Sequence, residues 1–414
     1  MSRLALPFAL LLTAVQAAVA YPMDGYPETG IRRLELVRLR VARQLSGPVV
    51  VKGSRRSIRD IHLNLAGPDS GRVRNLPPPD PGLQARIEAL FPDRDASYSI
   101  AVLDITPGRP VRYAGWQENV RYPPGSVGKL AIAAGLFAEL ARLYPDDPER
   151  RRQLLRTRLV PGGRWVAGDH HPVPFYDPAD SALVSRPAAE GDVFSLYEWA
   201  DHMLSASANS AGSVVWKEVM LMRAFGAAYP PSPEQEEAYF KSTPKSELQR
   251  LSLTVVNDPL RAAGIGLADW QLGTFFTDYG QAVVPGTSSY ASPRALVTYL
   301  LRLEQGRIVD PWSSLEIKRL IYMTARRIRY ASSPAIAASA VYFKSGSLYA
   351  CKPEEGFRCG KYMGNVKNYM NSVAIVETTD GKAYLVALMS NVLRKNSAVD
   401  HQTLATEIQG ILGR

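Results

Sequence analysis

The sequence predicts an α+β fold, in which an antiparallel sheet built from both ends of the main domain is flanked by helices and carries a mainly helical subdomain. Strand-like segments lie at residues 97–113 and again at 341–389, and the long stretch between them is mostly helical. The 414 residues are 46% hydrophobic and 21% charged. This is ordinary globular composition, with enough length to bury a large core.

Residues 1–20 have the pattern of an export signal. Arg3 supplies the charge, residues 4–15 the apolar core, and Ala18-Val19-Ala20 a small-residue cleavage site. We expect a mature protein that begins near Tyr21 and lies in the periplasm or is secreted. The competing interpretation is an uncleaved anchor. No later stretch is long enough to span a bilayer, so we expect no stable membrane span after cleavage.

Residues 21–76 form an Arg-rich N-terminal extension to which the sequence assigns no chemistry. Residues 31–45 are expected to be helical and residues 48–52 to form a strand. The proline-rich run Leu76-Pro77-Pro78-Pro79-Asp80-Pro81 is stiff and marks a boundary. The main domain is therefore expected at residues 77–414.

Periodicity and turn residues define the elements of the main domain. Leu83, Ile87 and Leu90 recur at helical spacing, and Thr106-Pro107-Gly108 separates two segments of strand composition. Ser292 and Pro293 give a cap and a first turn to a later amphipathic helix. The expected elements are, in order, a helix at 82–91, strands at 97–105 and 109–113, a helix at 126–143, a loop-rich stretch at 144–192, helices at 195–205 and 208–225, a polar insertion with helical content at 228–244, helices at 293–305 and 312–325, strands at 341–349, 370–377 and 383–389, and a closing helix at 398–412.

The helix at 126–143 carries the first chemical motif, Ser126-Val127-Gly128-Lys129. Residues three apart share a helix face, so the Ser126 hydroxyl and the Lys129 amine can sit side by side. Ser126 also lies at a helix N-terminus, where free N–H groups and the macrodipole favour developing negative charge. A hydroxyl beside an amine base in such surroundings is the layout of an activated nucleophile. Taken alone the motif is weak, because a solvated Lys one turn after a Ser is common.

Two further motifs follow in order. Ser207-Ala208-Asn209 lies between two helical segments, and Lys344-Ser345-Gly346 lies on a strand. Ser-x-x-Lys, Ser-x-Asn and Lys-Ser-Gly in this order are the motif set of penicillin-binding proteins and class A β-lactamases. From about Pro81 to its end, the sequence resembles the class A β-lactamase-like serine hydrolases. The run from Val283-Val284-Pro285-Gly286 to Pro293-Arg294 also resembles that family's loop before its next helix.

The residues and the resemblance together suggest roles. We expect Ser126 to attack a carbonyl, Lys129 to accept its proton once its pKa is lowered, and Ser207 to relay a proton to the departing nitrogen. Asn209 would hold a substrate amide and orient Lys129. Lys344, Ser345 and Gly346 would bind the substrate along the strand. The resemblance implies an oxyanion hole made by the N–H groups of Ser126 and Ser347.

The sequence departs from the family pattern at two places. Ala208 stands where β-lactamases usually have Asp, and no Glu-x-x-Asn run precedes Pro285-Gly286. In class A enzymes that Glu activates the water which releases the acyl group. The nearest acid in register is Asp278, which is interpreted either as a replacement base or as part of a surface turn. Without a positioned base, acylation should proceed and release should be slow.

Three further features concern a disulfide, nucleic-acid binding and metal binding. Cys351 and Cys359 in an exported chain are expected to form a disulfide. The formal net charge of +10 is scattered without a basic–aromatic register, so nucleic acid is not an expected partner. Asp169-His170-His171 lacks a third ligand, and no metal or cofactor is expected.

We therefore expect an exported, monomeric serine hydrolase that forms an acyl-enzyme on Ser126 with β-lactams or the D-alanyl amides of peptidoglycan stem peptides, and hydrolyses the amide. The alternative is a non-catalytic peptidoglycan-binding protein that retains the fold. The missing Glu, the basic charge and the Arg-rich extension motivate this alternative.

Overall fold

A central antiparallel sheet organises the molecule. The computed structural model describes residues 21–47, 50–179, 181–324 and 327–413, so the predicted signal at residues 1–20 lies outside the described residues. Within the described part, five strands pair in the order β2-β1-β11-β10-β9. These strands are β1 (Ser99–Asp104), β2 (Arg112–Trp116), β9 (Ala340–Ala350), β10 (Lys367–Glu377) and β11 (Ala383–Ser390). Strands far apart in the sequence meet where β1 pairs with β11, with Ser99 opposite Met389, which confirms the predicted α+β class.

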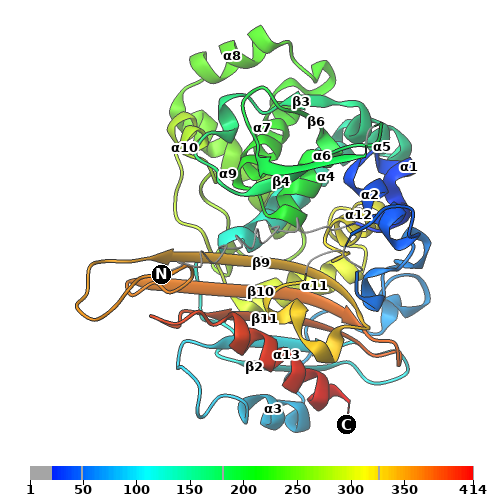
Figure 1. The fold of residues 1–414 in the computed structure, drawn as a ribbon, viewed down its shortest axis with the longest axis vertical. Coiled ribbons are helices and arrows are strands. Elements are labelled where there is room, and N and C mark those ends of the chain that lie inside the picture. Colours follow the sequence, from blue (N-terminus) through cyan, green and yellow to red (C-terminus); the bar gives the residue numbers. More distant parts are fainter. Residues whose placement is uncertain (1–20, 48–49, 180, 325–326, 414) are drawn as a thin grey trace, which may run out of the picture.

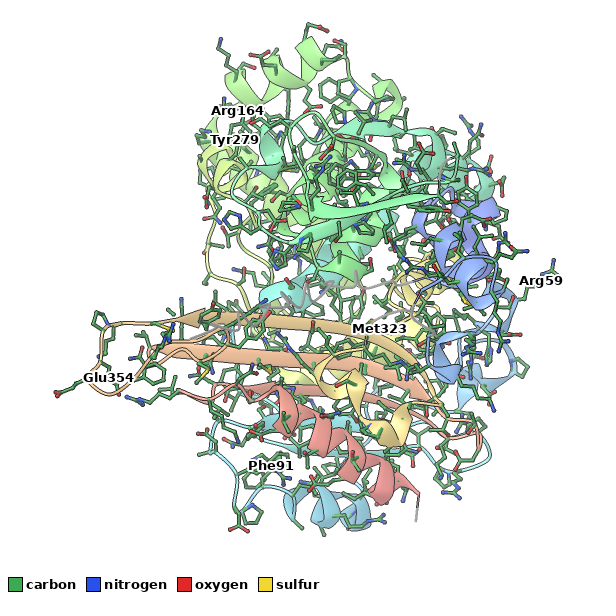
Figure 2. The ribbon with its side chains drawn as sticks, viewed as in Figure 1. Arg59, Phe91, Arg164, Tyr279, Met323 and Glu354 are labelled. Carbon is green, nitrogen blue, oxygen red and sulfur yellow. A yellow bond between two sulfur atoms is a disulfide. The ribbon has the colours of Figure 1, made fainter. Side chains whose placement is uncertain are left out.

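Helices cover both faces of this sheet (Figure 1). On one face α3 (Pro81–Glu88) and α13 (Ala398–Leu412) bury Leu83, Ile87 and Leu404 against the alternate strand residues. Phe91, labelled in Figure 2, lies in this lower layer and stacks on Trp116 with ring centroids 5.7 Å apart. The opposite face carries α11 (Pro293–Glu304) and the helical subdomain above it.

The helical subdomain is built around α4 (Lys129–Leu143), whose apolar sequence is buried over most of its length. α7 and α9 pack directly against α4. The subdomain and its connections comprise α5 (Pro148–Thr157), α6 (Leu196–Asp201), α7 (Asn209–Phe225), α8 (Pro233–Ser242), α9 (Lys245–Ala262), α10 (Asp278–Val283) and α12 (Pro311–Leu320), with short strands β3 (Leu159–Pro161), β4 (Pro172–Asp177), β5 (Ala182–Pro187), β6 (Val193–Ser195), β7 (Trp270–Gln271) and β8 (Tyr290–Ala291).

Several predicted elements need correction. The strand expected at 109–113 is β2, displaced towards Trp116, because its pairing is set by Asp104 opposite Arg112. The stretch at 144–192 is not mainly loop: it contains α5, which Asp147 caps, and a hairpin in which β4 is partly buried and β5 is exposed. No strand forms at residues 50–52, and residues 48–49 of that prediction lie outside the described part. The helix α9 had no prediction.

The N-terminal extension packs on the rest of the chain through α1 (Tyr26–Thr29), α2 (Arg33–Val41) and irregular segments. Arg33 Nε donates to Asp201 of α6 over 2.7 Å, in a pair of side chains that are almost completely buried. Arg56 pairs with Glu377 of β10. The extension therefore contacts both the helical subdomain and the sheet, and its blue ribbon lies alongside both layers in Figure 1.

Candidate active site

Ser126 and Lys129 lie at the entry to α4. Gly125–Gly128 form a 3₁₀ turn that leads into the helix, and this turn places the two side chains on one side. Lys129 Nζ lies 2.9 Å from Ser126 Oγ. The same nitrogen also donates to the Ser207 carbonyl at 2.7 Å and to Asn209 Oδ1 at 2.8 Å. The first two predicted motifs therefore converge on one amine.

The surroundings of Lys129 favour its neutral form. Its side chain is fully buried, and burial lowers its pKa to about 7, against the opposing effect of the Asp169 carboxylate. The ring centroid of Phe276 lies 4.6 Å from Nζ and forms an apolar wall beside it. Near neutral pH a substantial fraction of Lys129 therefore carries a lone pair able to accept the Ser126 proton.

Ser207 is held in a backbone conformation that is uncommon for a residue with a side chain. The π-helical turn His202–Ala206 ends at Ser207, whose φ is +61°. A positive φ outside glycine costs free energy and persists where the surroundings impose it, often at functional sites. Here the buried Ala208 anchors the turn in the core, and α7 starts at Asn209. The turn thereby presents the Ser207 carbonyl and the Asn209 amide to Lys129.

The strand β9 forms the opposite wall with the third motif. Lys344 Nζ donates to Ser207 Oγ at 2.7 Å, which joins the second and third motifs. Burial, and then the charges of Lys129 and Arg329, lower the pKa of Lys344 well below its usual value. Gly346 fits here because a Cβ would lie 2.1 Å from the Pro124 carbonyl oxygen. The turn that carries Ser126 thus packs against Gly346 too closely for any side chain there. The sequence alone does not reveal this contact.

Arg329 is a cleft residue that the sequence analysis missed. It begins the short 3₁₀ helix Arg329–Ser332 before β9, is 7% exposed, and donates from Nη1 to the Gly346 carbonyl at 2.7 Å. Burial lowers its pKa, yet a guanidinium remains charged in proteins. No motif identifies it in the sequence, because only the fold brings it beside Lys344. The Arg329 guanidinium therefore gives the cleft a positive charge suited to an anionic ligand.

A cleft of about 540 Å³ opens above these groups. Six predicted residues line it, namely Ser126, Ser207, Asn209, Ser345, Gly346 and Ser347. Lys129 and Lys344 lie buried behind its walls. Asp278 is exposed at the first turn of α10 and is not among the described residues that line the cleft. The structure therefore brings the three motifs together and leaves this acid outside them.

The remaining predictions concern the hairpin, metals and membranes. The disulfide between Cys351 and Cys359 is confirmed and lies in the hairpin between β9 and β10, near the tip where Figure 2 labels Glu354. Among the described residues, no group of three His, Cys, Asp or Glu side chains is placed to hold a metal ion. In the same part of the chain, no helix combines the length and apolar character needed to cross a bilayer.

Comparisons with known proteins agree with this architecture. Residues 248–409 match the model of the beta-lactamase enzyme family. A point mutant of PBP-A, solved as an acyl-enzyme complex with penicillin-G, has 16% identity and a TM-score of 0.51, covering 82% of this chain and 99% of that one. A class A beta-lactamase from Bacteroides cellulosilyticus has 14% identity and a TM-score of 0.50, covering 80% and 95%.

A beta-lactamase from Chitinophaga pinensis has 13% identity and a TM-score of 0.50, covering 80% of this chain and 98% of its own. At these identities the solved structures show a shared fold. No curated protein sequence matches the chain. The chain therefore has the fold of PBP-A and of these beta-lactamases, and its residues 248–409 match the model of the beta-lactamase enzyme family.

Proposed function

We propose that the protein is an exported active-site-serine hydrolase that forms an acyl-enzyme on Ser126 with β-lactams or D-alanyl peptide amides. The observation that carries the proposal is the 2.9 Å contact between Ser126 Oγ and Lys129 Nζ, an amine whose pKa is lowered to about 7. A hydroxyl next to an amine that is partly neutral at physiological pH is equipped for nucleophilic attack.

In the proposed acylation step, Ser126 Oγ attacks the amide carbonyl while Lys129 takes its proton. The Ser207 hydroxyl, which is hydrogen-bonded to Lys344, passes a proton to the departing nitrogen. Lys344 and Arg329 attract the carboxylate that β-lactams and D-alanyl peptides share. The developing oxyanion is stabilised by the N–H groups of Ser126 and Ser347, and such donors contribute about 3 kcal/mol each.

Labelling with a fluorescent penicillin tests this proposal. The wild-type protein should become labelled and Ser126→Ala should not. Ser185→Ala, which removes an exposed hydroxyl on β5, is the matched control and should label like the wild type. A wild-type protein that never takes up the probe would refute the proposal. Comparing hydrolysis of a chromogenic cephalosporin with D-Ala release from a pentapeptide separates β-lactamase from peptidase activity.

The second candidate is a peptidoglycan-binding protein that retains the fold without turnover. It is favoured by the net charge of +10 and by the absence of a carboxylate among the described residues that line the cleft. It predicts equal retention of wild type and Ser126→Ala on isolated peptidoglycan, with no adduct on either. A covalent adduct on Ser126, found by mass spectrometry, would exclude it.

We also propose that residues 1–20 direct export and are removed, that residues 77–414 are the hydrolase domain, and that the mature protein is a monomer in the periplasm or outside the cell. The charged, apolar and small-residue regions of the N-terminus support export. N-terminal sequencing of protein recovered from the periplasm should begin near Tyr21. A full-length N-terminus in the membrane fraction would indicate an anchor instead.

A further inference from the structure

Release of an acyl group from Ser126 needs a base that activates water. Among the described residues that line the cleft there is no Asp or Glu to serve as that base. The wall next to Lys129 is the ring of Phe276. The cleft lining does, however, contain one imidazole, that of His171. His171 was considered in the sequence only as a metal ligand, a role that the structure does not support.

His171 is oriented by a carboxylate that is itself rigidly held. Asp169 is buried, and its Oδ2 accepts hydrogen bonds from the Ser210 N–H at 2.7 Å and the Ser210 hydroxyl at 2.8 Å. Ser210 follows Asn209 directly at the start of α7. The other oxygen, Oδ1, accepts from the His171 N–H at 3.1 Å and contacts His171 Nδ1 at 2.6 Å. The loop that carries His171 is thereby tied to the motif turn.

This arrangement defines the tautomer of His171. Burial raises the pKa of Asp169, but hydrogen bonds from His171 and Ser210 outweigh it and hold the pKa far below its usual value. An ionised carboxylate only accepts, so Nδ1 of His171 must carry the proton that it shares with Asp169. In the neutral ring, Nε2 then has the free lone pair. The side chain is 45% exposed, and Nε2 has no hydrogen-bond partner in the described part of the chain.

A base oriented by a buried carboxylate, in the same cleft as a serine, is the arrangement that activates a nucleophile in serine hydrolases. Here Lys129 already serves Ser126 during acylation, so the imidazole is available for a second proton transfer. We propose that His171, positioned by Asp169, is the general base that activates water for hydrolysis of the acyl group on Ser126. This inference rests on the proposed acyl-enzyme function.

In the release step, a water oxygen attacks the ester carbonyl carbon of the acylated Ser126 while one water proton moves to Nε2 of His171. The tetrahedral intermediate collapses, and the bond between the acyl carbon and Ser126 Oγ breaks. Ser126 Oγ takes up the proton that the imidazolium releases, by way of water in the cleft. The products are a free carboxylic acid and the regenerated serine and imidazole.

Rapid-mixing kinetics with a chromogenic cephalosporin, together with mass spectrometry of the adduct, test the proposal by separating acylation from release. His171→Gln should acylate within about twofold of the wild-type rate and release product at least about 100-fold more slowly, the usual contribution of a general base. Its acyl adduct should therefore accumulate on Ser126. His170→Gln is the matched control, because His170 is exposed and does not line the cleft, and it should behave as the wild type.

A solvent isotope effect and chemical rescue distinguish a base from a residue that only supports the loop. Wild-type release should slow in D₂O, because the base takes a proton from water in that step, and added imidazole should restore part of the release lost in His171→Ala. The wild-type measurement can be made even if a variant fails to fold, and equal wild-type release in H₂O and D₂O would overturn the proposal. Equal release by His171→Gln and wild type, or a wild-type adduct that is never released, would also overturn it. A wild type that forms no adduct at all would instead refute the acyl-enzyme function.

Discussion

Lys129 Nζ and Asn209 Oδ1 lie 2.8 Å apart at the junction of α4 and α7, so the two side chains that accept hydrogen bonds from the amine, those of Asn209 and Ser126, are both neutral. This neutrality matters because a carboxylate in the same place would hold the lysine in its charged form. The lowered pKa of about 7 thus depends on an uncharged partner as well as on burial.

Asn209→Asp should therefore shift the acylation profile to higher pH. In the wild type, acylation should rise with pH through about 7 as Lys129 loses its proton. A carboxylate within hydrogen-bond distance raises the pKa of the amine by on the order of one unit or more. The acylation rate of the variant should therefore rise only at a correspondingly higher pH. Acylation rates measured with a chromogenic cephalosporin across the pH range give both curves.

Asn119→Asp provides the matched control, since it adds the same charge at an exposed position away from the cleft. Its profile should coincide with that of the wild type. Coincident profiles for wild type and Asn209→Asp would contradict the assignment of Lys129 as the acylation base.

Lys344 should take up a proton when an anionic ligand binds. Burial and the nearby charges of Lys129 and Arg329 lower its pKa well below the usual value in the free protein. A substrate carboxylate against Nζ favours the ammonium and raises that pKa, so binding at an intermediate pH draws a proton from solution. Titration calorimetry of Ser126→Ala with a β-lactam, repeated in buffers of different ionisation enthalpy, measures this uptake without acylation.

Adding Lys344→Met to the Ser126→Ala protein should weaken binding and reduce the proton uptake. The Ser126→Ala parent is the control, because it keeps Lys344 and its contact with Ser207. A binding enthalpy that is independent of the buffer in the parent protein would show that Lys344 does not change protonation on binding.

The N-terminal extension should contribute to stability through one buried ion pair. Removing one partner of such a pair typically costs about 3–5 kcal/mol, because the other charge stays buried without compensation. Arg33→Met should therefore lower the free energy of unfolding by roughly that amount through Asp201. Arg38→Met on the same helix breaks an exposed pair with Glu35 and should cost less than about 1 kcal/mol.

Urea unfolding at several pH values measures both variants. Burial already raises the pKa of Asp201, and loss of Arg33 raises it further, so the folded variant retains a proton that the unfolded chain releases. The stability of Arg33→Met should therefore fall as the pH rises from about 3.8, the pKa of Asp201 in the unfolded chain, through the pKa of Asp201 in the folded variant. The loss of stability relative to the wild type should be smallest in acid. Equal losses for the two variants would show that the extension is not anchored through Arg33.

The sequence predicted the parts of the cleft that are encoded locally. Ser126 and Lys129 share one turn, and their contact follows from helical spacing alone. Ser207 and Lys344 are far from Ser126 in the sequence, and only the order of the three motifs indicated that they belong to the same site. Arg329 could not be found in this way, because its place beside Gly346 depends on long-range packing.

The same limit applies to two other side chains. Asp278 was chosen for its register before Pro285, but register along a loop does not fix which way a side chain lies, and the structure leaves it exposed. His171 was weighed in the sequence as a metal ligand and set aside as part of a loop. Its relation to Ser210 became visible only when the loop met the start of α7.

His401 should make the protein acid-sensitive. It is fully buried in α13, with Nδ1 2.9 Å from Ser372 Oγ and Nε2 3.2 Å from Ser390 Oγ. Burial, and then the charge of Arg329, lower its pKa to about 3, whereas an unfolded chain has a histidine pKa of about 6.5. Between these values the unfolded chain binds more protons than the folded one, so stability rises with pH and is lost as the pH falls from about 6.5 to about 3.

Urea unfolding of His401→Gln should isolate this effect from that of other titrating groups. The wild type should lose on the order of 4 kcal/mol more than the variant between about pH 6.5 and about pH 3, since each pKa unit corresponds to about 1.4 kcal/mol. His62→Gln is the matched control at an exposed position, and its pH dependence should follow the wild type. If the free energy of unfolding of wild type and of His401→Gln depended on pH in the same way, His401 would accept a proton in the folded protein as readily as in the unfolded chain. Its burial under α13 would then not disfavour the charged imidazole.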